Sequence, residues 1–470
     1  MREKRNNLVW SWLSDALLAA LFVWGIVSAC YGLMQVLDMR RSRNMLFVLT
    51  GHFSNPGPYG GFIACVMAVA GAWLLRFPGG PGMTDMNPGK TGTAYARLGL
   101  RYLAWGALGM GVMVLPASMS RAGWLALAAA LAIEALRLPR VRGWIRGHRW
   151  VVPASVVVTA ALLVGAFLLK TESALGRFHI WRMECRAIAE RPWTGSGPGT
   201  LLWAYGEAQE AFFRANLDTA PAAVVRAAGC PEYAFNEFLG LGVEYGLPAL
   251  LLALLLVVSA VVVLHRAGSP FAAGLTAWAI FACASYPLSV PQLRILGIGF
   301  VLAAILTGCL RARKRLAGLV PLAVALALAG WTGLHGAFRE PAPENFRQVY
   351  ARGHALHQAG RYEASSEELE QGAKMSCDPM FEIILGKNAE ALGDDARAEA
   401  LYEKAHYMVP SRLYPLVRLM RLQIRTGRDQ EALQTAQRIV SMPVNDRHDM
   451  MVMLRRETQT TLDSLKNELR

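Results

Sequence analysis

Charged side chains are scarce in this chain. Of its 470 residues, only 17% are Asp, Glu, Lys or Arg, while 54% are hydrophobic. A soluble protein typically carries about 25% charged residues, so much of this chain must be solvated by lipid. The charge is sparse up to about residue 340 and dense after it. This break predicts a membrane domain over 1–340 and a soluble domain over 341–470.

Several motifs are also missing. The seven cysteines show neither a CxxC pair nor metal-ligand spacing, so we expect no metal site. Residues 195–199 read Gly-Ser-Gly-Pro-Gly but lack the lysine of a P-loop, so we expect no nucleotide or other cofactor. Cys185 and Cys230 lie in one loop outside the membrane and could pair. The other cysteines in apolar runs are expected to be small core residues: Cys30, Cys65, Cys283 and Cys309.

The net charge of +14 does not indicate a nucleic-acid partner. The basic residues cluster in short loops between apolar runs, as in 137–142 and 311–315. This placement is typical of topology signals and of contact with phospholipid. We therefore expect membrane lipids, and no nucleic acid, among the partners.

Apolar runs that can cross a membrane, at about 20 residues each, occur about nine times. The sequence therefore predicts an all-α, polytopic membrane helix bundle. We expect no cleavable signal peptide, because the first run is too long for one. The predicted spans are Ala16–Leu37, Tyr59–Leu75, Tyr102–Ser120, Ala122–Leu136, Trp150–Leu169, Leu247–Leu264, Phe271–Leu288, Ile295–Leu310 and Leu316–Leu334.

The distribution of lysine and arginine orients these spans. With the N-terminus inside, the inner loops collect most of the basic residues and the short outer loops hold few. The long loop over about 170–246 and everything after Leu334 then lie outside. The sequence thus predicts a multi-pass bacterial inner-membrane protein whose long loop and C-terminal domain are periplasmic.

The C-terminal part shows a repeat. Ala364, Ala398 and Ala432 are spaced 34 residues apart, and each follows a glycine by a few residues. This period is typical of tetratricopeptide repeats, which are stacked helix pairs that usually bind proteins. We expect a periplasmic helical-repeat domain that binds a protein partner through residues 342–470. An unrelated helical bundle is the alternative.

Two motifs lie at the predicted outer ends of membrane helices. Residues 51–61 read Gly-His-Phe-Ser-Asn-Pro-Gly-Pro-Tyr-Gly-Gly. They form either a non-helical segment that lines a cavity or a simple interfacial turn. Residues 118–124 read Ser-Met-Ser-Arg-Ala-Gly-Trp and place Arg121 at the membrane boundary. An ionisable residue there is a functional candidate, unless it only reaches for lipid headgroups.

The long outer loop carries two further motifs. In its first part, Arg177, Trp181 and Glu184 recur at helical spacing, as do Arg182 and Arg186. Guanidinium groups would therefore line a helix, which is either part of a site or an amphipathic helix on the membrane surface.

The end of this loop, residues 230–248, contains several carboxylates just before a predicted span. They would serve as a base or hold the arginines in place, and structural pairing is expected for at least one of them.

Taken in order, these motifs resemble the O-antigen ligase and polymerase superfamily, which includes bacterial O-linked oligosaccharyltransferases. The resemblance covers about residues 15–310 and rests on Gly51–Pro56, Ser120–Gly123, the run from Arg177 to Gly197, and Asn236–Gly246. It implies a glycosyltransferase-type enzyme. Such an enzyme moves a glycan from an undecaprenyl-diphosphate carrier to an acceptor on the periplasmic face, by inversion and without metal. The acceptor would be lipid A-core, a growing polysaccharide or a protein.

The resemblance also implies roles for individual residues. Arginine forks offer a diphosphate bidentate contacts and fixed positive charge, so Arg121 and Arg177 would hold the leaving group. Arg182 joins them from its helical position. The remaining candidates are Glu232 and Glu237 as catalytic carboxylates, and His52, Asn55 and Asn236 as substrate-binding residues.

The chain departs from the family pattern in two ways. Ligases of the family carry a histidine just before the asparagine of the last motif, proposed to activate the acceptor, and here that residue is Phe235. Either Glu232, Glu237 or His52 takes its place, or the reaction is dissociative enough to need little base. In addition, only one predicted span precedes the Asn-Pro motif, fewer than is usual for the family. These departures favour a second class of function, a non-catalytic membrane-anchored tetratricopeptide scaffold for polysaccharide assembly or export.

Overall fold

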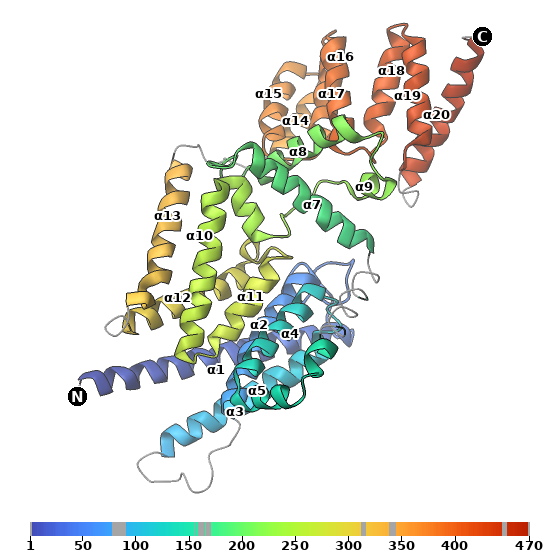
Figure 1. Cartoon of the computed structure of the whole chain (residues 1–470). Coiled ribbons are helices and arrows are strands. Elements are labelled where there is room, and N and C mark those ends of the chain that lie inside the picture. Colours follow the sequence, from blue (N-terminus) through green and yellow to red (C-terminus); the bar gives the residue numbers. More distant parts are fainter. Residues whose placement is uncertain are drawn as a thin grey trace. The chain divides into compact units, whose positions relative to one another are not determined.

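The computed structural model describes residues 2–77, 91–155, 157, 165, 171–311, 316–337, 345–443 and 449–468. Every regular element within these ranges is a helix (Figure 1), which confirms the predicted all-α class. The chain divides into two compact units. The bundle unit comprises residues 1–166, 235–238 and 252–328, and the loop–repeat unit comprises residues 167–234, 239–251 and 329–470.

The bundle unit contains most of the apolar helices. Two helices, α10 (Glu237–Ala267) and α13 (Val320–Ala337), belong partly to each unit. The other elements of the bundle unit are α1 (Arg2–Val36), α2 (Pro56–Arg76), α3 (Thr91–Val114), α4 (Arg121–Arg137), α5 (Pro139–Gly147), α11 (Phe271–Ala282), η2 (Pro287–Ser289), α12 (Pro291–Arg311) and η3 (Leu316–Leu319).

Four helices in the described ranges are long and apolar enough to cross a membrane: Trp12–Val36, Pro56–Arg76, Glu237–Ala267 and Pro291–Leu310. A fifth candidate is the pair α4 and α5, which bends by 88°. Phe271–Ala282 and Val320–Leu334 are shorter apolar helices. These helices are compatible with a membrane bundle. The predicted span Trp150–Leu169 lies mostly outside the described residues, and the expected number of about nine spans stays a prediction.

Helix α2 is the core of the bundle unit and is buried along most of its length. It packs against α1, α3, α4 and α11. Small residues allow this close approach, as is common between helices in membranes. A Cβ atom added at Gly60 would lie 2.3 Å from the Cβ of Ser120, and one added at Gly123 would lie 2.9 Å from the carbonyl oxygen of Gly60.

A buried charge cluster also joins three helices of the bundle unit. The Glu134 carboxylate, on α4, lies 2.9 Å from the Arg76 guanidinium at the end of α2 and 3.2 Å from Nδ1 of His265 on α10. Arg137 donates a hydrogen bond of 3.0 Å to the His265 carbonyl. A buried carboxylate is tolerated only with such partners, so removing one partner would destabilise this end of the bundle.

The loop–repeat unit is built from helices of the long loop and of the C-terminal part (Figure 1). The loop contributes α7 (Thr171–Glu190), α8 (Leu201–Asn216) and α9 (Ala222–Ala227). The C-terminal part contributes α14 (Phe346–Gln358), α15 (Tyr362–Ala373), α16 (Met380–Ala391), α17 (Asp395–Met408), α18 (Tyr414–Arg425), α19 (Asp429–Ser441) and α20 (Asp449–Glu468).

The same turn recurs in three consecutive pairs of these helices. Gly360, Gly393 and Gly427 end α14, α16 and α18 with φ values of +74°, +80° and +72°, a backbone that favours glycine. Ala398 and Ala432 are fully buried on the second helices of their pairs. The 34-residue spacing therefore corresponds to a repeated helix–turn–helix unit, and its assignment to the tetratricopeptide class stays a prediction.

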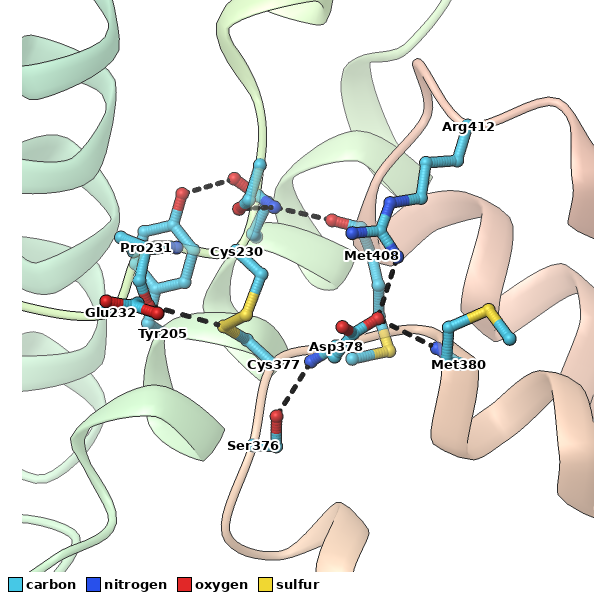
Figure 2. Close-up of a disulfide and its surroundings, with 12 residues drawn as sticks. Tyr205, Cys230, Pro231, Glu232, Ser376, Cys377, Asp378, Met380, Met408 and Arg412 are labelled. Carbon is cyan, nitrogen blue, oxygen red and sulfur yellow. Dashed lines mark hydrogen bonds and ion pairs between the residues drawn. A yellow bond between two sulfur atoms is a disulfide. The ribbon is translucent and has the colours of Figure 1, made fainter. Parts of the chain in front are cut away.

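Two kinds of link join the loop helices to the repeat helices within this unit. The Gln209 side chain, on α8, donates hydrogen bonds to the carbonyls of Met408 on α17 and of Gly229. A disulfide connects Cys230 to Cys377, 147 residues apart (Figure 2). The pairing of Cys185 with Cys230 that the sequence allowed does not occur, and Cys185 is free and exposed on α7. The partner of Cys230 comes from the repeat helices, far away in the sequence.

We expect Gly60→Ala to lower the free energy of unfolding by about 1–3 kcal/mol, because the added methyl group overlaps Ser120 and α2 cannot move away from α4 without losing packing. Thermal unfolding of the purified chain in detergent measures this loss. Gly109→Ala, in α3, is the matched control, because a Cβ at Gly109 meets nothing within 4 Å. Equal melting temperatures for the two variants would contradict the close packing.

We expect the double variant Cys230→Ser/Cys377→Ser to lose about 2–5 kcal/mol of stability in the loop–repeat unit, because the disulfide closes a long loop. Pulse proteolysis of the full chain in urea measures this loss. Cys185→Ser removes a free cysteine and should leave the urea midpoint unchanged. The prediction fails when the double variant unfolds at the wild-type urea concentration.

We expect acid to weaken the repeat helices through His406, which is fully buried on α17. Burial, and to a lesser extent the charge of Arg438, lowers its pKa from 6.5 to about 3. The unfolded chain therefore binds a proton between pH 6.5 and pH 3 that the folded chain does not bind. Stability is fully present above pH 6.5 and falls below it, by about 2 kcal/mol at pH 5.

Urea unfolding at pH 7 and pH 5 isolates this contribution when wild type is compared with His406→Leu. The leucine variant should lose about 2 kcal/mol less than wild type on acidification, since its side chain binds no proton. An identical pH dependence in both proteins would rule out this role of His406.

Candidate functional site

The first two motifs meet in the bundle unit. The Asn55 carboxamide caps α2 by accepting a hydrogen bond of 2.9 Å from the Gly57 N–H. The Ser120 side chain caps α4 by accepting one from the Gly123 N–H, and its hydroxyl donates one of 2.9 Å to the Gly57 carbonyl. Arg121 is the first residue of α4. The contact of α2 with α4 therefore places Arg121 beside the Asn-Pro motif.

The loop before Asn55 is held by a buried glutamine. The Gln35 side chain accepts hydrogen bonds from the N–H groups of Thr50 and Gly51 and donates one to the Gly51 carbonyl. Gly51 has a φ of +59° and lies against the Tyr59 ring, so a larger residue is excluded there. Residues 51–55 of the first motif are thus an ordered, non-helical segment, and residues 56–61 form the start of α2.

His52 projects from this segment. Its ring stacks on Tyr31 with centroids 3.8 Å apart, and its carbonyl accepts a hydrogen bond from Arg43. Partial burial, and then the charges of Arg43 and Arg40, lowers the pKa of His52, so the imidazole is neutral near pH 7. Neither arginine is among the residues that the sequence predicts for the site. Their signal was a basic cluster on the side of the membrane where short loops hold few such residues.

Residues 235–238 lie in the bundle unit. Phe235 has a φ of +53°, a left-handed conformation that is unfavourable for a bulky side chain, and its ring packs against Tyr286. The Asn236 side chain accepts a hydrogen bond from the Phe238 N–H. The Glu237 carboxylate accepts one of 2.6 Å from the Leu288 N–H. The side chains of Asn236 and Glu237 thus each hold a backbone N–H group. Their predicted roles in substrate binding and catalysis stay predictions.

The third and fourth motifs meet in the loop–repeat unit, at a break in α10. Gly246 has φ 81° and ψ 175°, which interrupts the helix. The Ser196 N–H donates a hydrogen bond of 2.8 Å to the Val243 carbonyl, and the Gly197 N–H donates one of 2.8 Å to the Glu244 carbonyl. The glycine-rich run therefore supplies donors to the carbonyls that the break leaves open.

The same contact continues on both sides of the break. The Leu247 N–H donates to the Pro192 carbonyl at 2.7 Å, and the Glu244 carboxylate accepts a hydrogen bond of 3.0 Å from the Gly199 N–H. Gly195 has a φ of +65°, and a Cβ there would lie 2.4 Å from the Glu244 backbone. The Gly-Ser-Gly-Pro-Gly run is therefore a backbone strap on α10 and not a phosphate cradle.

Helix α7 presents part of the predicted row of arginines. The guanidinium groups of Arg182 and Arg186 both lie over the Phe212 ring, at 4.7 and 4.8 Å from its centroid, so these two residues share one face as expected. Arg177 lies near the start of α7. Glu184 is buried in the core instead, near Tyr205, and burial raises the pKa of its carboxyl well above the usual range.

Glu232 lies next to the disulfide (Figure 2). Its carboxylate pairs with the Arg347 guanidinium at 2.5 Å, and both side chains are more than half exposed. A surface ion pair of this kind contributes little stability. Its predicted catalytic role is untested. Across the described ranges, no group of three or more His, Cys, Asp or Glu side chains is placed to hold a metal ion.

Comparison with known protein families supports the resemblance. Residues 105–254 match the model of the O-antigen ligase family. Members of this family are O-antigen ligases and polymerases, which are glycosyltransferase-like enzymes of polysaccharide assembly. The matched segment includes Arg121, Arg177 and the strap on α10. No curated protein matches the chain, and no solved structure does. Together with the apolar helices, the match indicates a membrane protein and supports the O-antigen ligase superfamily.

Proposed function

We propose that this chain transfers a glycan from undecaprenyl diphosphate to an acceptor on the periplasmic face of the inner membrane. The observation that carries this proposal is the match to the O-antigen ligase family over residues 105–254. That segment contains the arginines that the resemblance assigns to the donor. It also contains both the strap and the part of α10 to which the strap is hydrogen-bonded.

The donor needs fixed positive charge, because its diphosphate leaves with a growing negative charge. Arg121 supplies a guanidinium at the first turn of α4, where the N-terminal end of the helix dipole also favours an anion. Arg177 supplies a second guanidinium from α7, and Arg182 extends the row. Under this proposal Arg121 and Arg177 each bind the diphosphate, and neither loses its proton at physiological pH.

The reaction is a displacement with inversion. The acceptor oxygen attacks the anomeric carbon, the bond from that carbon to the phosphate oxygen breaks, and undecaprenyl diphosphate leaves with the electron pair. The acceptor proton must go to a base, and Phe235 cannot take it. Of the three predicted substitutes, Glu232 is in an ion pair and Glu237 accepts a backbone hydrogen bond. His52 carries a neutral imidazole near pH 7 and is assigned this proton.

The periplasmic placement draws support from the disulfide. Cys230 lies in the loop predicted outside, and Cys377 lies in the predicted periplasmic domain. Disulfides persist in the bacterial periplasm and are rare in the cytosol. The lysine and arginine distribution of the sequence supports the same orientation.

Phe235 favours the alternative function, a non-catalytic scaffold. Its side chain exchanges no proton and packs against Tyr286. In that case the membrane helices would anchor the repeat helices, which would gather partners of polysaccharide assembly or export through residues 342–470. The donor-binding arginines separate the two functions, because a scaffold does not need them.

We expect Arg121→Ala and Arg177→Ala each to lower the rate of glycan transfer by at least about a hundredfold, because each removes a charge that stabilises the leaving diphosphate. Transfer from a lipid-linked glycan is measured with membranes that contain equal amounts of each variant. Arg121→Lys keeps the charge but loses the bidentate fork, and an intermediate rate is expected.

Arg294→Ala is the matched control, since Arg294 is an exposed arginine at the start of α12 and outside the matched segment. It should transfer at the wild-type rate. Wild-type rates in both Arg121→Ala and Arg177→Ala would reject the transferase function. The scaffold function would then be supported if deletion of residues 342–470 abolished surface polysaccharide.

A further inference from the structure

A groove within the loop–repeat unit has no role in the proposed transfer chemistry. It has a volume of about 650 Å³, in the range of ligand sites. One wall is α8 with the strap before it, contributing Ser196, Thr200 and Trp203. The other wall comes from α15, α16 and α17, with Lys374, Glu382 and Lys404 among its residues. We call this cavity the α8 groove.

The charges that line the α8 groove are largely paired with one another. The Lys404 ammonium lies 3.0 Å from a carboxylate oxygen of Glu207 and 3.0 Å from one of Glu382. The Arg397 guanidinium lies 2.5 Å from the Glu370 carboxylate. A polyanion such as a diphosphate needs cations that are not already neutralised. Five of the seven charged lining residues form these pairs, and Arg191 and Lys374 lie outside them. The groove therefore suits a ligand that is rich in hydroxyl groups and carries little charge, because paired ions still present donors and acceptors at fixed positions.

Trp203 adds a flat apolar surface among these polar groups. Its indole packs against the buried core of the unit, and the Arg191 guanidinium lies 5.4 Å from the ring centroid. The Thr200 hydroxyl is held by the Ser196 hydroxyl and the Gly197 carbonyl. Sugar rings combine an apolar C–H face with polar edges, so an anchored aromatic ring next to fixed hydroxyl and ionic groups matches their chemistry.

A peptide matches the lining less well. Nine of the thirteen lining residues are polar or charged, and the apolar ones are Trp203, Ala373, Leu385 and Leu401. Helical peptides are recognised through rows of apolar anchors that insert into hydrophobic grooves. The α8 groove offers no such row along either wall.

One end of the groove is formed by the strap, which lies within the segment that matches the family. Ser196, on its rim, donates a hydroxyl hydrogen bond of 2.9 Å to the Val243 carbonyl beside the break in α10. A chain bound along α8 would therefore start at the strap and lie between α8 and the repeat helices. The disulfide between Cys230 and Cys377 belongs to the same unit and helps to keep the two walls together.

We propose that the α8 groove binds the saccharide part of the glycan substrate. This inference rests on the proposed function and assigns the repeat helices to the substrate of that reaction. Lipid and diphosphate are bound elsewhere, so the groove recognises a soluble saccharide without them.

The test uses the full chain in lipid nanodiscs. The probe is an oligosaccharide of a few repeat units, released by mild acid from the surface polysaccharide of the producing bacterium and free of lipid and phosphate. Binding is followed by calorimetry and by saturation-transfer NMR. We expect Trp203→Ala to weaken binding about tenfold or more. Trp144→Ala, an exposed tryptophan in the bundle unit, should bind like wild type.

Lys374→Ala is a second variant, chosen because Lys374 is exposed and its loss leaves the core intact. We expect about fivefold weaker binding, the loss of one hydrogen-bond donor. Oxidation of Cys230 and Cys377, checked by thiol labelling, confirms that both variants are folded. Wild-type affinity in both folded variants would overturn the inference, as would absence of saccharide binding to wild type. Binding of random-sequence peptides that depends on Trp203, without saccharide binding, would also overturn it.

Arg121→Ala separates this inference from the proposed function. It should bind the oligosaccharide with wild-type affinity although its transfer rate is at least about a hundredfold lower, because the probe has no diphosphate. If transfer depends on Arg121 and Arg177 but the saccharide does not bind in the groove, the inference alone is wrong. If transfer is unaffected by both arginines, the proposed function is wrong, whatever the groove binds.

Discussion

A helix that is interrupted leaves backbone carbonyl and N–H groups that need other partners, and in a mostly apolar chain few partners are available. Gly246 creates this requirement in α10. The strap, together with Pro192 before it, meets this requirement through hydrogen bonds to Val243, Glu244 and Leu247. The strap then leads into α8, which carries Gln209 and one wall of the α8 groove. The break in α10 therefore fixes the strap and, through the strap, the start of α8.

The bundle unit depends on a different constraint, the close approach of α2 and α4. Gly60 and Gly123 permit it, and Ser120 fastens it through the Gly57 carbonyl. As a result, the Asn-Pro motif and Arg121 lie next to each other, although more than 60 residues separate them in the sequence. In both units, glycines that look like loop residues in the sequence are there because a side chain would collide with a neighbouring backbone or side chain.

Much of the architecture was predictable from local patterns. Long apolar runs predicted α2, α10 and α12, because hydropathy and length depend on composition alone. The 34-residue period predicted recurring helix pairs, and its glycines do adopt left-handed turns. Helical spacing predicted that Arg182 and Arg186 share a face. Contacts between distant segments were not predictable in this way, and Cys230 pairs with Cys377 instead of Cys185 for that reason.

The candidate site, too, was predictable from the sequence only in part. The sequence by itself determined the all-α class, the separation of an apolar from a charged region, and the shared face of Arg182 and Arg186, because composition, period and helical spacing are local properties. Only the tertiary structure decided that Glu184 is buried, that Glu232 pairs with Arg347, and that Arg40 and Arg43 lie near His52. Burial and electrostatic environment depend on which segments pack together, and local sequence patterns do not show this.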